Sequence, residues 1–277
     1  MLGLMKKMDK IKKYYRPISL YLSHGAGPMP LLGDDGHKEM VENLNIISAK
    51  IAKPSAIILI SAHWEEVSPT ITLGTHPSLI YDYYGFPKQA YEIQYPASGD
   101  PTLARTVFSL LGDKGIESIL DDKRGFDHGL FVPLKIMYPE ADVPCIQLSL
   151  VDSLNAREHI KIGEALSGLE NENLLVIGSG FSFHNMKAFF VPSTIETQSM
   201  NESFEQWLME TCSNPKIDEI ERTNRLVNWQ NAPSARYCHP REEHLLPLHV
   251  CYGVAKRACR DFFDLNILGK KASVYLW

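Results

Sequence analysis

The sequence predicts an α/β fold, a single domain with a central, mostly parallel or mixed sheet and helices on both faces. Short apolar runs alternate along the chain with longer amphipathic segments, which is typical of strands that alternate with helices. The 277 residues, 44% of them hydrophobic and 22% charged, are enough to bury a large core. The sequence also contains no internal repeat, low-complexity linker or change in composition that would mark a domain boundary. We therefore expect one domain.

The first half of the chain shows this alternation clearly. Ile18–Leu22 is expected to be a strand, and Lys38–Lys53 has apolar residues at helical spacing before Pro54 ends it. Ala56–Ile60 is a continuous apolar run, typical of a strand that is buried on both faces. The same reasoning predicts helices over Pro101–Leu111, Ala156–Leu169, Ser199–Cys212 and His244–Cys259, and strands over Pro144–Leu150, Leu174–Ile177 and Ser273–Trp277.

Composition and charge limit the environment and the partners. Residues 1–16 carry five lysines and no long apolar run follows them, so we expect a basic N-terminal tail rather than a signal peptide, followed by the domain over residues 17–277. The net charge of −5 argues against nucleic acid as a main partner, and no stretch reaches the roughly 18 apolar residues of a membrane span. Five scattered cysteines, never spaced as CxxC, indicate free thiols and a cytoplasmic protein.

Three histidines follow predicted strands. His24 comes directly after the first strand, His63 follows Ala56–Ile60, and His184 lies just beyond Leu174–Ile177. Each of them alone would be interpreted as an ordinary loop residue. Because ligands of open α/β sheets bind outside the carboxyl ends of the strands, the three together indicate a shared crevice.

Other histidines lie in less regular surroundings. Asp127 precedes His128 and Gly129 in a turn, where the acid either orients the histidine or caps the turn. The segment 239–249 leads into a predicted helix, and a helix start is a rigid position for a ligand. Neutral imidazole suits zinc, copper, iron and nickel alike, and the spacing matches neither a zinc finger nor HExxH. Three histidines with polar or turn-like neighbours are expected at the surface: His37, His76 and His159.

Six short segments together carry a family resemblance. Each is weak alone, but they occur in the family order from about Ile18 to Trp277 and resemble the class III, LigB-type extradiol ring-cleavage dioxygenases, most of all the DOPA 4,5-dioxygenase-like branch. The segments are Ser23-His24-Gly25 with Pro28, Ile60–Glu65, Ile80–Pro87, Asp127–Gly129, Gly178–Gly180 with His184-Asn185, and Glu243–Leu248.

The resemblance implies a role for each matched histidine. It implies three metal ligands: His24, His63 and His244. Glu243 stays an alternative third ligand, because protocatechuate-cleaving relatives use a glutamate there. His184 would be the acid/base residue, close enough to serve as a fourth ligand in the substrate-free site. His128 would contact substrate or oxygen.

The resemblance also implies the reaction and the cofactor. We expect a non-haem Fe(II) enzyme that opens a catechol ring and incorporates both atoms of O2, with the small-molecule catechol and O2 as its partners. L-DOPA, cleaved at the 4,5 bond to seco-DOPA, fits the branch, while caffeate, protocatechuate or another catechol stays open. Zn(II) can occupy the same site, because imidazole ligands bind Zn(II) more tightly than Fe(II) in the usual order.

Substrate contacts are expected from residues beside the histidines. Trp64 and Tyr84, with other aromatic residues of the segment 81–86, either form a wall for a flat substrate or pack in the core. Arg241 either pairs with a substrate carboxylate or is a solvated surface charge. The residue types alone leave two other functions open, a zinc-dependent hydrolase at the same histidines and a catalytically inactive metal-binding relative.

Overall fold

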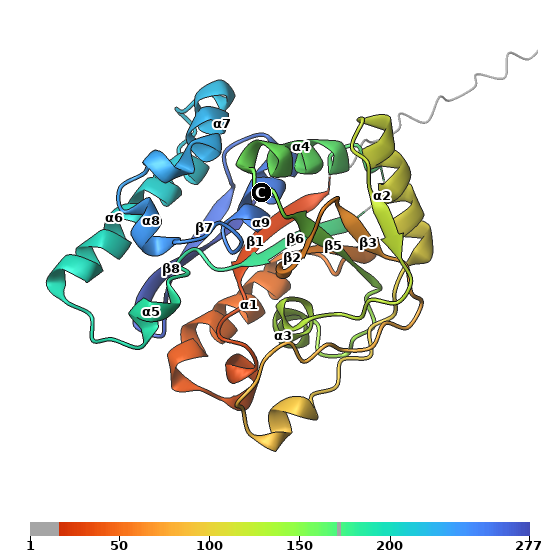
Figure 1. Cartoon of the computed structure of the whole chain (residues 1–277), viewed down its shortest axis with the longest axis horizontal. Coiled ribbons are helices and arrows are strands. Elements are labelled where there is room, and N and C mark those ends of the chain that lie inside the picture. The colour runs from red at the N-terminus through yellow and green to blue at the C-terminus, as the bar shows by residue number, and fades with distance from the viewer. Residues whose placement is uncertain (1–16, 171–172) are drawn as a thin grey trace, which may run out of the picture.

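An eight-stranded mixed sheet runs through the protein (Figure 1), as seen in a computed structural model that describes residues 17–170 and 173–277. The strand order is β4-β3-β5-β2-β6-β1-β8-β7. The strands are β1 Ile18–Ser23, β2 Ala56–Glu66, β3 Thr70–Thr72, β4 Ile119–Asp121, β5 Cys145–Val151, β6 Leu174–Gly180, β7 Asp261–Ile267 and β8 Lys270–Leu276. The predicted α/β class is confirmed, while the predicted tail, residues 1–16, lies outside the described residues.

The four central strands, β5, β2, β6 and β1, are parallel neighbours. Their apolar runs are buried on both faces, which explains why they lack the alternating pattern of a half-exposed strand. Strand β8 pairs antiparallel with both β1 and β7, and β3 pairs antiparallel with β5. The carboxyl ends of the four parallel strands therefore meet at one edge of the sheet.

Helices cover both faces of the sheet, as predicted. Helix α9 packs on β6 and β1 and is itself covered by α4, whereas α3 packs on β2 and contacts α1 on the opposite side (Figure 1). The described helices are α1 Lys38–Lys50, α2 Pro101–Asp113, α3 His128–Met137, α4 Ala156–Leu166, α5 Met186–Phe189, α6 Ile195–Ser213, α7 Glu219–Val227, α8 Ala235–Cys238 and α9 Leu246–Ala255. None of them combines the length and the hydropathy that a bilayer crossing requires.

The structure shifts two predicted boundaries that matter for the histidines. Strand β2 continues to Glu66, so His63 lies within a strand and not after it; a register shift against β5 between Ile60 and Glu65 allows the longer pairing. Helix α9 begins at Leu246, so His244 lies in the preceding turn. The sequence pattern did not predict three strands and one helix. The strands β3 and β4 are short and β7 is partly exposed, and the helix α3 contains Pro133.

Two of the three histidines expected at the surface are buried. His37 and His159 have no exposed surface, and only His76 is exposed. The Nδ1 atom of His159 lies 2.8 Å from the carbonyl oxygen of Asn155, and its Nε2 atom accepts a hydrogen bond from the backbone N–H of Val151 at 3.1 Å. The prediction was wrong because these histidines serve backbone groups of the loops around them, and their polar neighbours gave no sign of it.

His159 makes the stability of the protein depend on pH. Burial lowers the pKa of His159 to about 4 from 6.5, so between these values the unfolded chain binds a proton that the folded protein excludes. The free energy of unfolding therefore decreases as the pH falls. The pKa shift of His159 should lower it by about 2 kcal/mol between pH 7.5 and pH 5. Urea unfolding of the metal-free protein should show a smaller pH dependence for His159→Gln than for the wild type. His76→Gln is the control. If the free energy of unfolding depended equally on pH in all three proteins, the assignment would be contradicted.

Candidate metal centre

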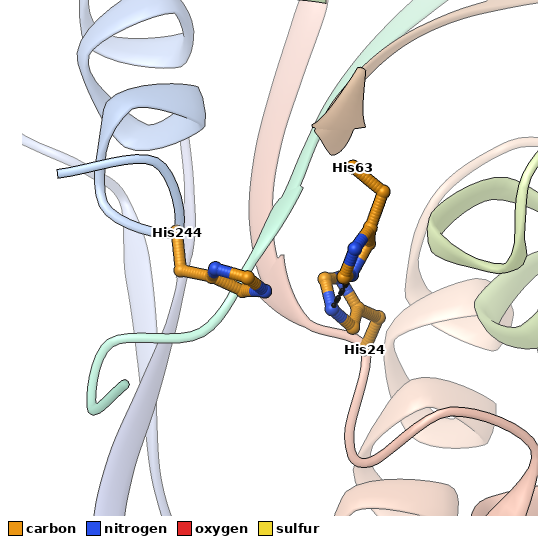
Figure 2. Close-up of side chains that lie close together, drawn as sticks. All are labelled: His24, His63 and His244. Atoms are coloured by element: carbon orange, nitrogen blue, oxygen red, sulfur yellow. Dashed lines mark hydrogen bonds between the residues drawn. The ribbon is translucent and has the colours of Figure 1, made fainter. Parts of the chain in front are cut away.

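Three histidines from separate segments converge at the carboxyl edge of the parallel strands (Figure 2). His24 follows β1, His63 lies near the end of β2, and His244 lies in the turn before α9. One ring nitrogen of each lies within 4.8 Å of the corresponding atoms of the other two, and the Nε2 atoms of His24 and His63 are 2.9 Å apart. The convergence expected from the sequence is therefore present.

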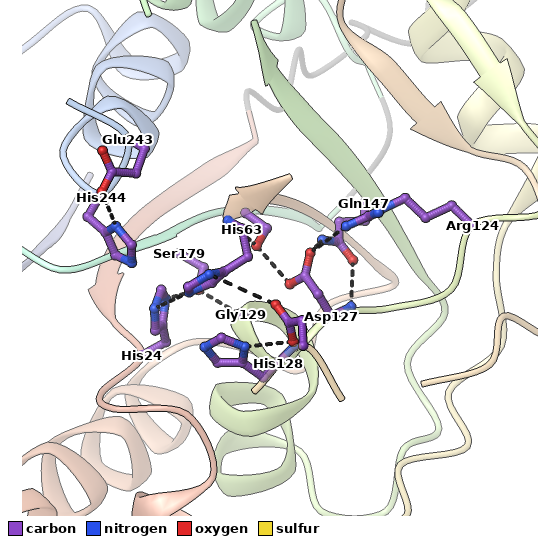
Figure 3. A network of polar contacts seen from close by, with 12 residues as sticks. His24, His63, Arg124, Asp127, His128, Gly129, Gln147, Ser179, Glu243 and His244 are labelled. Atoms are coloured by element: carbon purple, nitrogen blue, oxygen red, sulfur yellow. Dashed lines mark hydrogen bonds and ion pairs between the residues drawn. The ribbon is translucent and has the colours of Figure 1, made fainter. Parts of the chain in front are cut away.

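The hydroxyl group of Ser179 fixes the orientation of His24. It donates its only proton to the carbonyl oxygen of Gly129 at 2.5 Å, so its oxygen must accept the hydrogen bond from the Nδ1 atom of His24 at 2.9 Å (Figure 3). The proton of the neutral imidazole is thereby placed on Nδ1. The Nε2 atom of His24 then carries a lone pair that faces His63 and His244.

The segment that carries His244 lies directly against β6. The carbonyl oxygen of His244 accepts hydrogen bonds from the backbone N–H of Phe181, at 3.1 Å, and from the hydroxyl of Tyr21, at 2.9 Å. A side chain at Gly180 would collide with this carbonyl group, so glycine is required there for the backbones to approach.

The carboxylate of Glu243 holds two histidines at once. Its Oε1 atom lies 3.1 Å from the Nδ1 atom of His244 and 3.0 Å from that of His184. The two rings stack with their centroids 3.4 Å apart, at an interplanar angle of 14°. With both Nδ1 atoms directed to one carboxylate, the Nε2 atoms of both rings remain available.

A different acid holds His128. The side chain of Asp127 turns away from His128 and accepts hydrogen bonds from Ser61, Gln147 and Arg124 (Figure 3). The Nδ1 atom of His128 lies instead 2.7 Å from Oδ1 of Asp82. Asp127 occupies the N-cap position of α3, but its side chain makes no capping hydrogen bond, so the structure shows neither of the two roles considered for this acid in the sequence.

Burial keeps the central imidazoles neutral. It is the largest cause that holds the pKa of His24 and of His63 well below the ordinary value, and repulsion from the other histidines adds to it. Burial likewise lowers the pKa of His244 to about 3. Burial opposes ionisation of Glu243, but hydrogen bonds from His184 and His244 outweigh it and lower the pKa of its carboxyl group. Near neutral pH the site thus presents neutral imidazoles beside an ionised carboxylate.

This donor set fits a transition-metal ion. Neutral imidazole nitrogens are ligands for iron and zinc, and here one ring nitrogen of each histidine lies within 4.8 Å of the others, with His24 and His244 buried and His63 half-buried. The Nδ1 atoms of His24 and His244 are engaged by Ser179 and Glu243, an arrangement that orients metal-binding histidines in proteins. His24, His63 and His244 could therefore hold a metal ion.

The residues expected to contact substrate are placed differently from the histidines. Trp64 is only 2% exposed, and it donates a hydrogen bond to Glu66 and stacks against the guanidinium group of Arg124. Tyr84 is 92% exposed, and among the described residues it makes no hydrogen bond or ring contact. The ring of Tyr83 is the one that lies against His128, with the two centroids 5.7 Å apart.

Arg241 is already paired with two acids. Its guanidinium group binds both carboxylate oxygens of Glu65, at 2.5 and 2.6 Å, and lies 3.4 Å from Oε2 of Glu243. Arg241 therefore connects the end of β2 to the segment of His244 and, as placed, is not free for a substrate carboxylate.

Two residues of the site were missed in the sequence. Asp82 lies among three tyrosines of the segment 81–84, and only the aromatic residues of this segment were expected to contact the substrate. Ser179 lies between two glycines, and no role was predicted for its hydroxyl group. Its place just beyond the predicted strand Leu174–Ile177 was the available signal, because histidines that bind metals need partners for their second nitrogen. Asp82 follows no predicted strand, so the sequence offered no such signal for it.

The protein is similar to ring-opening dioxygenases over nearly its whole length. Residues 19–275 match the family described as "Catalytic LigB subunit of aromatic ring-opening dioxygenase". The chain is 38% identical to "Dioxygenase tasH" of Hapsidospora irregularis, with 92% of this chain and 84% of the relative covered. It is 37% identical to "4,5-DOPA dioxygenase extradiol" of Beta vulgaris, with 91% and 90% covered.

A solved structure is also similar. The crystal structure of the uncharacterized protein JW3007 from Escherichia coli K12 superimposes with a TM-score of 0.74 at 26% sequence identity, and the match covers 94% of this chain and 99% of that one. The overall fold is thus shared with a solved structure.

The contact between Ser179 and His24 can be tested by metal binding. In Ser179→Ala, the His24 ring loses the acceptor for its Nδ1 proton, so we expect the affinity for Zn(II) to fall about 10- to 100-fold. Competition with a chromophoric chelator measures this. Ser149→Ala is the matched control, because that buried serine accepts a hydrogen bond from the backbone of Thr70 and makes no hydrogen bond with a histidine in the described part of the chain. Wild-type affinity in Ser179→Ala would refute the role.

Proposed function

This chain belongs to the LigB family of aromatic ring-opening dioxygenases and is an extradiol dioxygenase, and from this premise we propose that it opens a catechol ring at Fe(II) held by His24, His63 and His244. The convergence of three imidazoles that burial keeps neutral, two of them buried and His63 half-buried, is the observation that carries the assignment of these ligands. The family and the relatives favour this reaction over the zinc hydrolase and the inactive relative that the residue types alone left open.

The metal would supply the coordination positions for a diol and O2 and the redox chemistry between them. The protein residues would supply orientation and proton transfer. His184 is suited to accept the proton of a catechol hydroxyl, since its Nδ1 atom is directed to Glu243 and its Nε2 atom makes no hydrogen bond among residues 17–170 and 173–277. After the transfer, the ionised carboxylate of Glu243 would stabilise the charged imidazole.

His128 is proposed to act on the substrate from another side of the centre. Its ring lies 3.9 Å from that of His63 and 5.4 Å from that of His24, measured between centroids. At this distance it can contact a substrate or an oxygen-derived anion beside the metal ligands. In these proposed roles, His184 and His128 would each increase the rate of the reaction roughly 100- to 10000-fold.

L-DOPA is the proposed substrate, with 4,5-cleavage to seco-DOPA. Relatives from Beta vulgaris, Mirabilis jalapa and Portulaca grandiflora, 35–38% identical to this chain, carry the name "4,5-DOPA dioxygenase extradiol". A carboxylate on the substrate could pair with Arg241 only if Glu65 released it. Trp64 and Tyr84 are also proposed to contact the substrate, although neither ring contacts a histidine among residues 17–170 and 173–277. A cytoplasmic location is also proposed, on the ground of five free, buried thiols.

The reaction is tested by O2 uptake. Protein loaded anaerobically with Fe(II) should consume one O2 for each L-DOPA, and both atoms of 18O2 should appear in the ring-opened product by mass spectrometry. Caffeate and protocatechuate in the same panel test the choice of substrate, and Zn(II)-loaded protein is the inactive control. Catechol left intact by fully iron-loaded protein would overturn the proposed function.

The ligand set is tested by metal content. We expect His63→Ala and His244→Ala to lose bound iron, because each removes one imidazole of three. Glu243→Gln should retain iron with affinity lowered about 10- to 100-fold, because its amide oxygen can still accept a hydrogen bond from His244. Elemental analysis after gel filtration measures the iron. Iron retained by His244→Ala and lost by Glu243→Gln would make Glu243 the third ligand.

The role of His184 is tested by separating metal content from turnover. His184→Ala should keep its iron and lose turnover roughly 100- to 10000-fold, because it removes an acid/base group and no required ligand. His76→Ala is the control, since His76 is exposed and has no contact with the site. A variant that lost its iron and kept the turnover per bound iron would refute the acid/base role.

A further inference from the structure

The segment between β3 and α2 delivers one acidic side chain to the site. Asp82 lies in this segment, residues 73–100, ahead of its one short 3-10 helix, Lys88–Tyr91, and its side chain is 23% exposed. Its Oδ1 atom accepts two hydrogen bonds from the same residue, one from the backbone N–H of His128 at 3.1 Å and one from the Nδ1 atom of that ring at 2.7 Å. A carboxylate bound at both the backbone and the ring fixes where the His128 side chain points.

The second oxygen of Asp82 faces a proposed metal ligand. Oδ2 lies 3.9 Å from the Nδ1 atom of the neutral His63 ring, which is beyond hydrogen-bond distance. Glu243 lies closer to its two rings, within hydrogen-bond distance of both His244 and His184. Asp82 therefore stands between a proposed metal ligand and a proposed substrate-contacting histidine, as Glu243 does on another side of the centre.

The contact determines which nitrogen of His128 is available. An ionised carboxylate can only accept, so the Nδ1 atom of His128 must donate to Asp82, and the Nε2 atom of the neutral ring carries the lone pair. Within the described part of the chain, this Nε2 atom has no hydrogen-bond partner. The rings of His63 and Tyr83 lie on either side, with centroids at 3.9 and 5.7 Å. The ring thus has one polar anchor and one free nitrogen.

The position of Asp82 is itself held on both sides. The hydroxyl group of Tyr81 donates to the carbonyl of Ile93 at 2.7 Å, and that of Tyr83 donates to the carbonyl of Ala90 at 2.5 Å. These two bonds fold the segment 81–93 back on itself. The tyrosines beside Asp82 therefore serve to hold the acid in place as well as to pack beside the site.

We propose that Asp82 is a positioning residue of the ring-opening reaction, which fixes the orientation and the tautomer of His128 so that its Nε2 atom faces the bound substrate. The proposal rests on the proposed function of His128. It assigns to Asp82, on a separate segment, the role that the sequence had suggested for the neighbouring Asp127.

Two substitutions test the role of Asp82. Asp82→Ala removes the acceptor, and we expect kcat to fall about 10- to 100-fold while KM and iron content change little. Asp82→Asn keeps an oxygen that can accept from the His128 ring, so it should recover most of the loss. Glu92→Gln is the matched control, because it removes a charge from the same segment at an exposed ion pair with Lys88. It should retain wild-type kcat.

A double-mutant cycle separates this role from a merely structural one. If Asp82 acts through His128, adding Asp82→Ala to His128→Ala should lower kcat less than twofold further, whereas independent effects would multiply. Wild-type kcat in Asp82→Ala, loss of iron in proportion to activity, or multiplied losses in the double variant would each overturn the inference. Wild-type kcat in His128→Ala would instead show that the proposed function of His128 is wrong.

Discussion

The site depends on keeping several imidazoles neutral and oriented within one small buried space. Protonated rings at these distances would repel one another, and burial already disfavours their charged forms. A neutral imidazole has one donor and one acceptor, so its function is decided by the partner of its Nδ1 atom. Four rings have such partners in the structure: His24 with Ser179, His244 and His184 with Glu243, and His128 with Asp82. Each of these partners leaves the Nε2 atom of its ring available to the centre.

The backbone makes this arrangement possible because parallel strands end together. β1 and β2 flank β6, so His24 and His63 reach the same edge although 39 residues separate them. His244 comes from far along the chain and has no strand to place it. Its carbonyl group is held by Phe181 and Tyr21, and the absence of a side chain at Gly180 lets the two segments touch. The same short stretch of β6 therefore supplies the close approach and, at Ser179, the partner of His24.

Sequence patterns were sufficient to predict the α/β class and the convergence of the histidines, but they did not predict the hydrogen-bond partners of the rings. The apolar runs of β1, β2, β5 and β6 reveal their burial directly, and histidines near strand ends point to one crevice. The partner of a histidine depends on tertiary contacts over long separations: Asp82 is 46 residues from His128, whereas the adjacent Asp127 binds Ser61 and Gln147 instead. Trp64 and Arg241 show the same limit. Trp64 follows His63 directly, but proximity in sequence does not decide on which side of the strand a side chain lies. Arg241 is close to His244 in sequence, but this does not predict its ion pair with Glu65.

The placement of the two carboxylates also bears on why a histidine can serve as the third ligand. Three neutral imidazoles carry no negative charge, so they would not balance the charge of a divalent cation that they bind. Asp82 and Glu243 are both ionised, since hydrogen bonds from their histidines outweigh burial and lower the pKa of each. Each stands one ring away from the centre, where it would offset part of that charge without occupying a coordination position. The same carboxylates hold His128 beside His63 and His184 beside His244, so one pair of acids would both balance the charge of a bound ion and orient the two proposed proton-accepting nitrogens.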